Sequence, residues 1–308
     1  MTTADSVFDA ARHLKFGPPV TVRNLTLIPL VGAGERDAEY RTLDDALAAG
    51  WIRVTEIDRQ GSVPQLKVTN VGDTAVFLLD GEELVGAKQN RVLNLSGLVP
   101  AHHEIVVPVS CVEAGRWHHV SDSFSSSPRA QFAEGRAAKM RQVTRSMEAD
   151  GRRASDQSAV WSLIAEKTQH LSASSATGAM SAAFEKVERP IDDIVGGFPP
   201  IERQSGAVFA IDGRVAGLEC FDAPSTWRKL APKLVRSYAL DTLDPSGRRS
   251  LTAVEDASTW LARLTMTAAT VLPAVGEGED VRLSGPDLAG AALVARGRVI
   301  HLSAFPNA

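Results

Sequence analysis

The chain is poor in cysteine and in long apolar runs, and each shortage excludes a class of protein. Its 308 residues include only two cysteines, Cys111 and Cys220, so a secreted fold held by a disulfide framework is not expected. The first residues lack a continuous apolar h-region, and no apolar run approaches the ~20 residues that span a bilayer. We therefore expect a cytoplasmic protein with no membrane partner.

Excess positive charge is also missing, because the formal net charge is −4. A protein that binds duplex nucleic acid is usually basic, so nucleic acid is not expected as a partner. Apolar residues make up 44% and charged residues 23% of the chain, which is ordinary for a globular protein. The length predicts about two domains or one large one.

Familiar cofactor and catalytic motifs are absent: the sequence contains no G-x-G-x-x-G, P-loop, G-x-S-x-G, C-x-x-C or H-E-x-x-H pattern. Four of the seven histidines stand in two pairs, at 102–103 and 118–119. One interpretation is a metal site built from these histidines with Cys111 and Glu113. However, the two pairs flank opposite ends of one expected strand, which places them too far apart to bind the same ion unless the chain folds back. We predict no metal site, and the sequence indicates no particular cofactor.

The patterns along the chain predict an α+β fold in three parts. Residues 1–125 are rich in short strands and predict an antiparallel β-sandwich or partial barrel. Residues 126–198 predict a helical section. The serine-rich stretch 122–128 at its start is expected to be a linker, and Ser127 is expected to cap a helix that starts near Arg129. Residues 199–308 predict an α+β unit of two β-hairpins and two helices.

The two hairpins of the last part resemble each other. Residues 206–221 read GAVFAIDGRVAGLECF and residues 290–305 read GAALVARGRVIHLSAF, with seven identical positions in sixteen. The Asp-Gly pair between apolar runs is a strong hairpin signal. Either the unit is repeated, or two hairpins with similar turns look alike because alternating apolar patterns inflate identity.

A polar segment follows the apolar run Ala75–Leu79 and reads DGEELVGAKQNRVLN. With a strand ending at Leu79, Glu82 and Glu83 would stand on a short loop, where carboxylates can act as general acids or bases. Arginine and lysine nearby can hold a phosphate or carboxylate, and the amides can bind hydroxyl groups. The alternative is a solvated polar hairpin end. The candidate ligand-binding residues are Lys88, Gln89, Asn90 and Arg91.

A second polar set follows the apolar strand 104–112. Glu113 offers a further carboxylate, while Arg116 and Trp117 offer a charge and a stacking face suited to a base or a ribose phosphate. Cys111 as a nucleophile is disfavoured, since a lone cysteine in an apolar strand is more often a small buried side chain.

The strings LLDGEELVGAKQNRVLN, VPVSCVEAGRW and GAVFAIDGRVAGLECFD together resemble the ADP-ribosylglycohydrolase- and rhodanese/phosphatase-associated protein domain family, from about Val20 to Phe305. The resemblance implies a role near NAD or ADP-ribose metabolism, and no settled reaction. It places the family's functional residues on two groups of positions: Glu82, Glu83, Lys88, Gln89, Asn90 and Arg91, and Cys111, Glu113, Gly115, Arg116 and Trp117.

Three functions compete. In the first, the protein hydrolyses an ADP-ribose-like or other phosphorylated nucleotide metabolite, with Glu82, Glu83 and Glu113 as catalytic carboxylates. In the second, it is a non-catalytic nucleotide-binding or scaffold module that acts with a partner enzyme. In the third, the polar residues make subunit contacts in a homo-oligomer.

Overall fold

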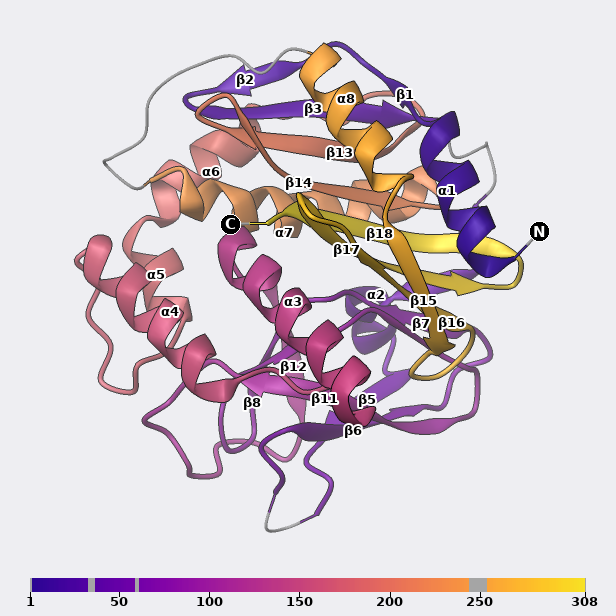
Figure 1. Ribbon diagram of the computed structural model, residues 1–308. Helices are drawn as coiled ribbons and strands as arrows, with labels where there is room; N and C mark the ends of the chain where they lie inside the picture. The colour runs from indigo at the N-terminus through magenta and orange to yellow at the C-terminus, as the bar shows by residue number, and fades with distance from the viewer. Residues whose placement is uncertain (1, 33–36, 59–60, 244–253, 308) are drawn as a thin grey trace. The chain divides into compact units, whose positions relative to one another are not determined.

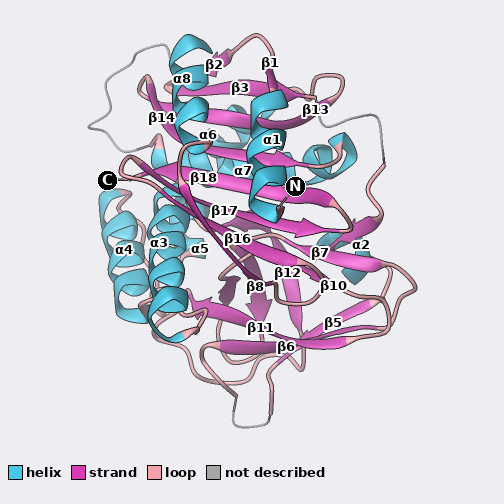
Figure 2. Ribbon diagram, turned by 45° about the vertical axis from the view of Figure 1, so that its right-hand side comes forward, coloured by secondary structure: helices cyan, strands magenta, loops and turns pink. Residues whose placement is uncertain are grey.

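Two different β-structures organise the chain, one in each of two units. The computed structural model describes residues 2–32, 37–58, 61–243 and 254–307. Unit 1 comprises Met1–Ala38, Pro190–Ala274 and Gly278–Ala308, and unit 2 comprises Glu39–Arg189 and Val275–Glu277. Figures 1 and 2 show helices and mostly antiparallel strands in both units, so the predicted α+β class is confirmed.

Unit 1 is built on a nine-stranded sheet in the order β1-β3-β13-β14-β18-β17-β16-β15, with β2 also paired to β3. The first strands of the chain thus lie in the same sheet as both C-terminal hairpins. The strands are β1 (Lys15–Phe16), β2 (Val20–Val22), β3 (Leu25–Val31), β13 (Gln204–Ile211), β14 (Arg214–Phe221), β15 (Ala268–Pro273), β16 (Glu279–Ser284), β17 (Leu288–Ala295) and β18 (Arg298–Pro306).

The two similar sequences form two similar hairpins at the centre of this sheet. Each hairpin turns through two residues with positive φ, and each shifts register at the same place, after Phe209 in one and after Leu293 in the other. β14 pairs with β18 so that Glu219 faces Ser303, the residue at the equivalent position of the other hairpin. The hairpins are therefore related by a local two-fold axis, which supports a repeated unit.

Helices cover both faces of the unit 1 sheet (Figures 1 and 2). On one face, α1 and α8 pack Val7, Trp260 and other apolar side chains against the sheet. On the other face, α7 stacks Tyr238 on Phe209 with ring centroids 3.9 Å apart. α7 is one continuous helix that includes Pro232. The helices of this unit are α1 (Thr3–His13), α6 (Glu188–Gly196), α7 (Pro224–Asp241) and α8 (Val254–Leu264).

Unit 2 is built on a closed six-stranded barrel in the order β11-β6-β5-β12-β8-β9, and a small sheet of β10, β7 and β4 accompanies it. The alternating apolar residues of the barrel strands, such as Val54, Val68 and Val107, form its core. The barrel strands are β5 (Ile52–Thr55), β6 (Gln65–Asn70), β8 (Glu82–Gly86), β9 (Arg91–Leu93), β11 (Glu104–Cys111) and β12 (Phe124–Ala130); the small sheet contains β4 (Tyr40–Thr42), β7 (Ala75–Leu78) and β10 (Gly97–Val99).

The first helix after the serine-rich stretch begins at Ala133, later than the sequence suggested. The prediction of a linker with a helix start at Ser127 was wrong, because this stretch is strand β12, paired with β8 and β5. Ser127 uses its hydroxyl to bind Glu83 instead of capping a helix. The helices are α2 (Leu43–Ala48), α3 (Ala133–Asp150), α4 (Gln157–His170) and α5 (Ser181–Lys186).

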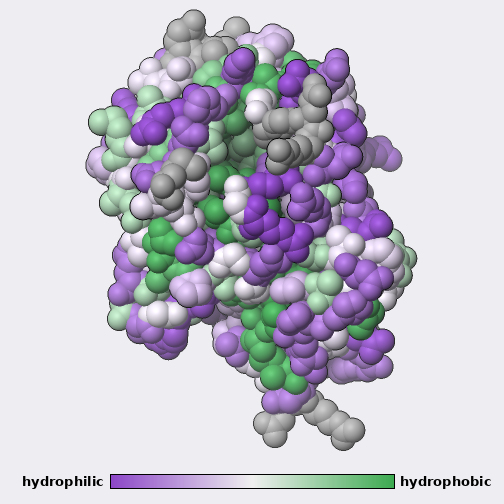
Figure 3. Space-filling view, turned by 90° about the vertical axis from the view of Figure 1, so that its right-hand side faces the viewer, coloured by the Kyte–Doolittle hydropathy of each residue, from purple (hydrophilic) through white to green (hydrophobic). Residues whose placement is uncertain are grey.

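The surface view in Figure 3 shows mainly hydrophilic residues, with hydrophobic residues exposed in separate patches. In the described parts of the chain, none of the helices combines the length and the apolar character that crossing a bilayer requires.

Candidate functional site

The polar segment that the sequence singled out forms a hairpin of the barrel in unit 2. The prediction that Glu82 and Glu83 stand on a loop was wrong, because β8 runs from Glu82 to Gly86 and pairs with both β12 and β9. The chain then turns through residues 87–90. Gly86 has φ of 131°, and a Cβ there would lie 2.6 Å from the hydroxyl of Ser121, so only glycine fits this turn.

Glu83 is fully buried in the wall of the barrel. One of its carboxylate oxygens, Oε2, accepts hydrogen bonds from the Ser127 hydroxyl at 2.7 Å and from Arg129 Nε at 3.1 Å. Arg129 also pairs with Glu185 of α5. Burial raises the pKa of Glu83, while the attraction of Arg129 opposes that rise. Glu83 is thus a carboxyl group whose protonated form is favoured by its surroundings.

Asp80, just before β8, belongs to a cluster of buried charges that the sequence did not indicate. Asp80 contacts two fully buried cations of helix α3: Lys139 Nζ lies 2.9 Å from Oδ1, and Arg136 Nε lies 3.4 Å from Oδ2. Lys139 also donates to the carbonyl of Leu93. Glu82 accepts a hydrogen bond from the backbone of Leu79. This arrangement anchors α3 to the barrel and is structural in character.

Glu113 and Arg116 form a buried ion pair where strand β11 ends. Arg116 Nε and Nη2 lie 2.8 and 2.6 Å from Glu113 Oε2, and Thr177 donates to Oε1 at 2.9 Å. The backbone N–H of Asn90 donates to the same carboxylate at 3.1 Å. Burial alone would raise the pKa of Glu113, but the hydrogen bonds from Arg116, Thr177 and Asn90 outweigh it and lower the pKa.

The β8–β9 turn is tied to this ion pair by its amides. Asn90 Oδ1 accepts from Arg116 Nη2 at 2.9 Å, and Gln89 Nε2 donates to the carbonyl of Glu113 at 3.1 Å. Arg116 also donates to the carbonyls of Ala87 and Gly86. Five of the expected site residues therefore meet at one end of the barrel, and we call them, with Trp117, the barrel-end cluster: Gln89, Asn90, Arg91, Glu113, Arg116 and Trp117.

Arg91 is the least satisfied member of the barrel-end cluster. Its side chain is fully buried, and Nη1 donates to Gln89 Oε1 at 2.9 Å. Within the described residues, neither Nε nor Nη2 has a hydrogen-bond acceptor. Burial lowers the pKa of Arg91, and the positive charge of Arg116 lowers it further, while Cys111, Glu56 and Glu113 oppose the shift. A buried guanidinium with two open donor nitrogens is costly and calls for an anionic acceptor.

Two neighbours define the chemistry around Arg91. Trp117 is 48% exposed, and its ring centroid lies 5.7 Å from the guanidinium carbon of Arg91 and 5.2 Å from Lys88 Nζ. Cys111 faces Arg91 directly across the β9–β11 pair. Burial raises the pKa of the Cys111 thiol, which keeps it protonated and poorly nucleophilic.

The expected carboxylates do not all share this site. Glu83 neighbours Leu84, the residue that pairs with Arg91, and adjacent residues of a strand point to opposite faces. Glu113 joins the barrel-end cluster, whereas Glu82 and Glu83 contact other residues. Arg129 is a partner of Glu83 and Thr177 is a partner of Glu113; both come from distant segments, and no local pattern marks them.

Metal-ligand side chains do not converge in the described part of the chain, where no group of three or more His, Cys, Asp or Glu residues is placed to hold an ion. One histidine of each pair contacts a surface carboxylate instead: His102 contacts Asp73 and His119 contacts Asp122.

Comparison with known proteins identifies the family. A family model described as the ARG and Rhodanese-Phosphatase-superfamily-associated Protein domain matches residues 13–305. Searches of the curated proteins and of the solved structures found no match. The description associates the domain with ADP-ribosylglycohydrolase-type enzymes and with the rhodanese-phosphatase superfamily. Because the model matches nearly the whole chain, the protein belongs to the ARG and Rhodanese-Phosphatase-superfamily-associated Protein domain family.

Proposed function

We propose that the protein binds an ADP-ribose-like or other phosphorylated nucleotide metabolite at the barrel-end cluster, as a non-catalytic module that acts beside a partner enzyme. The observation that carries the proposal is the buried guanidinium of Arg91, whose Nε and Nη2 have no acceptor within the described residues. Nε and Nη2 of one guanidinium point side by side, which matches two oxygens of a phosphate.

Charge balance supports an anionic ligand. Glu113 is the carboxylate of this cluster, and Arg116 holds it at 2.6 Å. Glu113 therefore neutralises Arg116. Glu56 attracts Arg91 electrostatically, but Nε and Nη2 of Arg91 have no hydrogen-bond acceptor within the described residues. A phosphate bound to Arg91 would replace the missing acceptors and compensate the buried charge, so the ligand gains a charge-assisted contact that water cannot match.

Trp117 supports a nucleotide in particular. Half of its side chain is exposed, and its ring lies close enough to Arg91 for one ligand to reach both. Stacking of a base on an aromatic ring contributes roughly 1–3 kcal/mol. Because Arg91 has no exposed surface, the proposal requires Trp117 to move aside when the ligand enters.

Binding is favoured over hydrolysis by the state of the carboxylates. Glycoside hydrolysis needs two carboxyl groups on either side of one bond, one of them able to donate a proton. The lowered pKa of Glu113 makes it a poor acid, and Glu83 points to the other face of β8. Hydrolysis by Glu83 is the second candidate, favoured by its raised pKa and by Oε1, which has no hydrogen-bond partner within the described residues.

A thermal-shift screen separates these candidates. ADP-ribose, ADP and ribose 5-phosphate are each added to the wild-type chain and to the variants Arg91→Met and Arg53→Met. Arg53 is a matched control, because it is an exposed arginine on strand β5 of the same barrel. At 100 times its Kd, a ligand stabilises the protein by about 2.7 kcal/mol. We expect stabilisation of the wild type and Arg53→Met, and its loss in Arg91→Met.

Turnover is then measured with the same compounds and with ADP-ribosylated substrates. Binding without turnover supports the module. Turnover that is lost in Glu83→Gln supports the hydrolase. If none of the nucleotides or phosphates shifts the melting temperature of the wild type, the proposal fails.

A further inference from the structure

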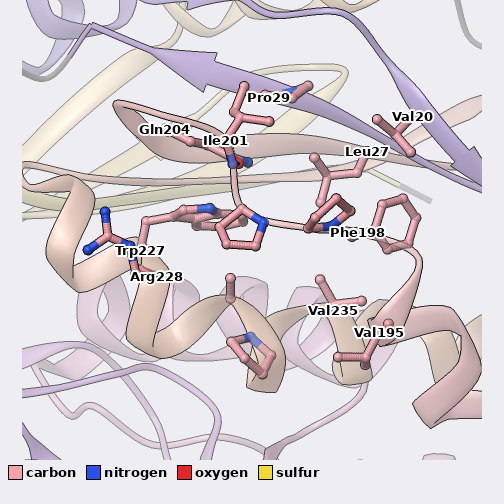
Figure 4. A pocket seen from close by; sticks show the side chains of 15 residues that line it. Val20, Leu27, Pro29, Val195, Phe198, Ile201, Gln204, Trp227, Arg228 and Val235 are labelled. Carbon is pink, nitrogen blue, oxygen red and sulfur yellow. The ribbon is translucent and has the colours of Figure 1, made fainter.

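A cavity of about 320 Å³ lies within unit 1, far along the sequence from the barrel-end cluster. It is bounded by strands β2 and β3, by the loop that leads from α6 to β13, and by helix α7 (Figure 4). At ~30 Å³ per water, this volume equals about ten water molecules. It falls within the range of roughly 300–1,000 Å³ that small-molecule sites occupy.

The walls of the cavity are almost entirely carbon. Thirteen of its fifteen lining residues are apolar or glycine, and Gln204 and Arg228 are the other two. Gln204 is already engaged, since its amide donates to the carbonyl of Gly206 and accepts from the N–H of Ile201. A ligand that fills this cavity must therefore be apolar along most of its length.

The aromatic wall is preformed. Trp227 is 2% exposed and is held by tilted contacts with Phe209 and Phe221, at centroid distances of 6.3 and 6.4 Å. A rigid wall loses little conformational freedom when a ligand binds, which favours affinity. Because Phe209 and Phe221 hold Trp227 in place, this side chain does not turn into the cavity and fill it.

Arg228 is the one charged residue that lines the cavity. It is exposed, and the described residues offer it no acidic partner. Figure 4 shows Arg228 beside Trp227 at one end, and Val20, Leu27 and Phe198 toward the other. The cavity therefore has a cationic end and an apolar end.

We propose that unit 1 binds a small amphipathic monocarboxylate, such as a medium-chain fatty acid, with its carboxylate at Arg228 and its chain between the sheet and α7. Two features select this class. The volume and carbon walls of the cavity suit an apolar body of about ten heavy atoms, and a lone guanidinium at one end suits a single negative charge. This site is independent of the nucleotide site proposed for unit 2.

The test is calorimetric titration of the full chain with decanoate and with decanol, its uncharged counterpart. Wild type binds decanoate saturably with one site per chain. In Arg228→Gln the affinity for decanoate falls about fivefold, the effect of one partly exposed charge contact, while the affinity for decanol does not change. The control is Lys229→Gln, which removes an exposed cation of the same helix outside the cavity and leaves both affinities unchanged.

A second pair of variants tests the location. Ala231→Trp fills the cavity from α7, and Val195→Phe fills it from α6, so each abolishes binding of both compounds. Two variants on different helices keep the test valid if one of them fails to fold. The proposal is overturned if decanoate shows no saturable binding, if the folded filling variants bind like wild type, or if Arg228→Gln weakens decanol as much as decanoate.

Discussion

Arg116 Nη2 lies 2.6 Å from Glu113 Oε2, and both side chains are more than nine-tenths buried. This ion pair joins the end of β11 to the β8–β9 turn, because Arg116 also binds Asn90 and the carbonyls of Gly86 and Ala87. It holds in place the turn that leads into Arg91. The ion pair is therefore the structural support of the proposed nucleotide site.

Removing one partner of this pair should be strongly destabilising. Arg116→Ala leaves the buried carboxylate of Glu113 without its cation, and we expect a loss of about 3–5 kcal/mol in the free energy of unfolding. Urea denaturation measures this loss. The control is Arg152→Ala, which removes an exposed pair with Asp150 and should cost far less stability. Equal costs for the two variants would contradict a structural role for Arg116.

Acid should weaken the same ion pair. The pKa of Glu113 is lowered below its ordinary value of 4.5, so its contribution to stability is complete above pH 4.5 and is lost as the pH falls through the folded pKa. We expect the stability difference between wild type and Glu113→Gln to be constant above pH 4.5 and to shrink below it. Unfolding free energies measured across this range would contradict the assignment if the difference did not depend on pH.

Glu83 should show the opposite pH dependence. Its pKa is raised above 4.5, so the folded state binds the proton more tightly than the unfolded state, and stability falls as the pH rises from 4.5 toward the folded pKa. Glu83→Gln replaces the carboxyl group by a neutral amide and removes this fall. The variant should therefore gain stability relative to wild type as the pH rises. Parallel stability profiles for the two proteins would show that burial does not shift the pKa of Glu83.

Gly81 should tolerate no side chain. Its φ is +80°, and a Cβ would lie 2.7 Å from Cδ of the fully buried Arg136. Gly81→Ala adds backbone strain to overpacking, and we expect a loss of about 2–4 kcal/mol. Gly50 is a matched control, because its φ is +68° but no atom lies within 4 Å of its Cβ position. Gly50→Ala should cost only about 1–2 kcal/mol, and a loss at Gly81 no larger than this would show that Arg136 moves aside freely.

Local patterns in the sequence predicted the elements of the fold better than their pairing. The Asp212–Gly213 turn and the alternating residues around it predicted a hairpin, and the hairpin is present. Nothing local indicated that β3 pairs with β13, more than 170 residues later in the chain, or that β9 and β11 close a barrel. Such pairings depend on burial in the folded protein, and a strand's own residues do not encode its partner.

The candidate site was also predictable only in part, because local patterns indicate its residues but not the partners that the fold brings to them. Asn90, Arg91, Glu113 and Arg116 belong to short polar stretches at strand ends, and such stretches of adjacent strands meet when a sheet closes. The glycines on either side of Glu82 and Glu83 favour a loop, yet the ion pair between Glu83 and Arg129 of β12 allows Glu83 to be buried in a strand. Arg129 lies 46 residues after Glu83. The functions of the site residues remain predictions.

Calorimetric titration with ADP-ribose tests the central claim most directly. Wild type and Arg53→Met should bind one ADP-ribose per chain with the same affinity, while folded Arg91→Met should bind at least about tenfold more weakly, since a hydrogen bond to a charged group contributes roughly 1.5–3 kcal/mol. The account would be contradicted if wild type bound no ADP-ribose, or if folded Arg91→Met bound it as tightly as wild type.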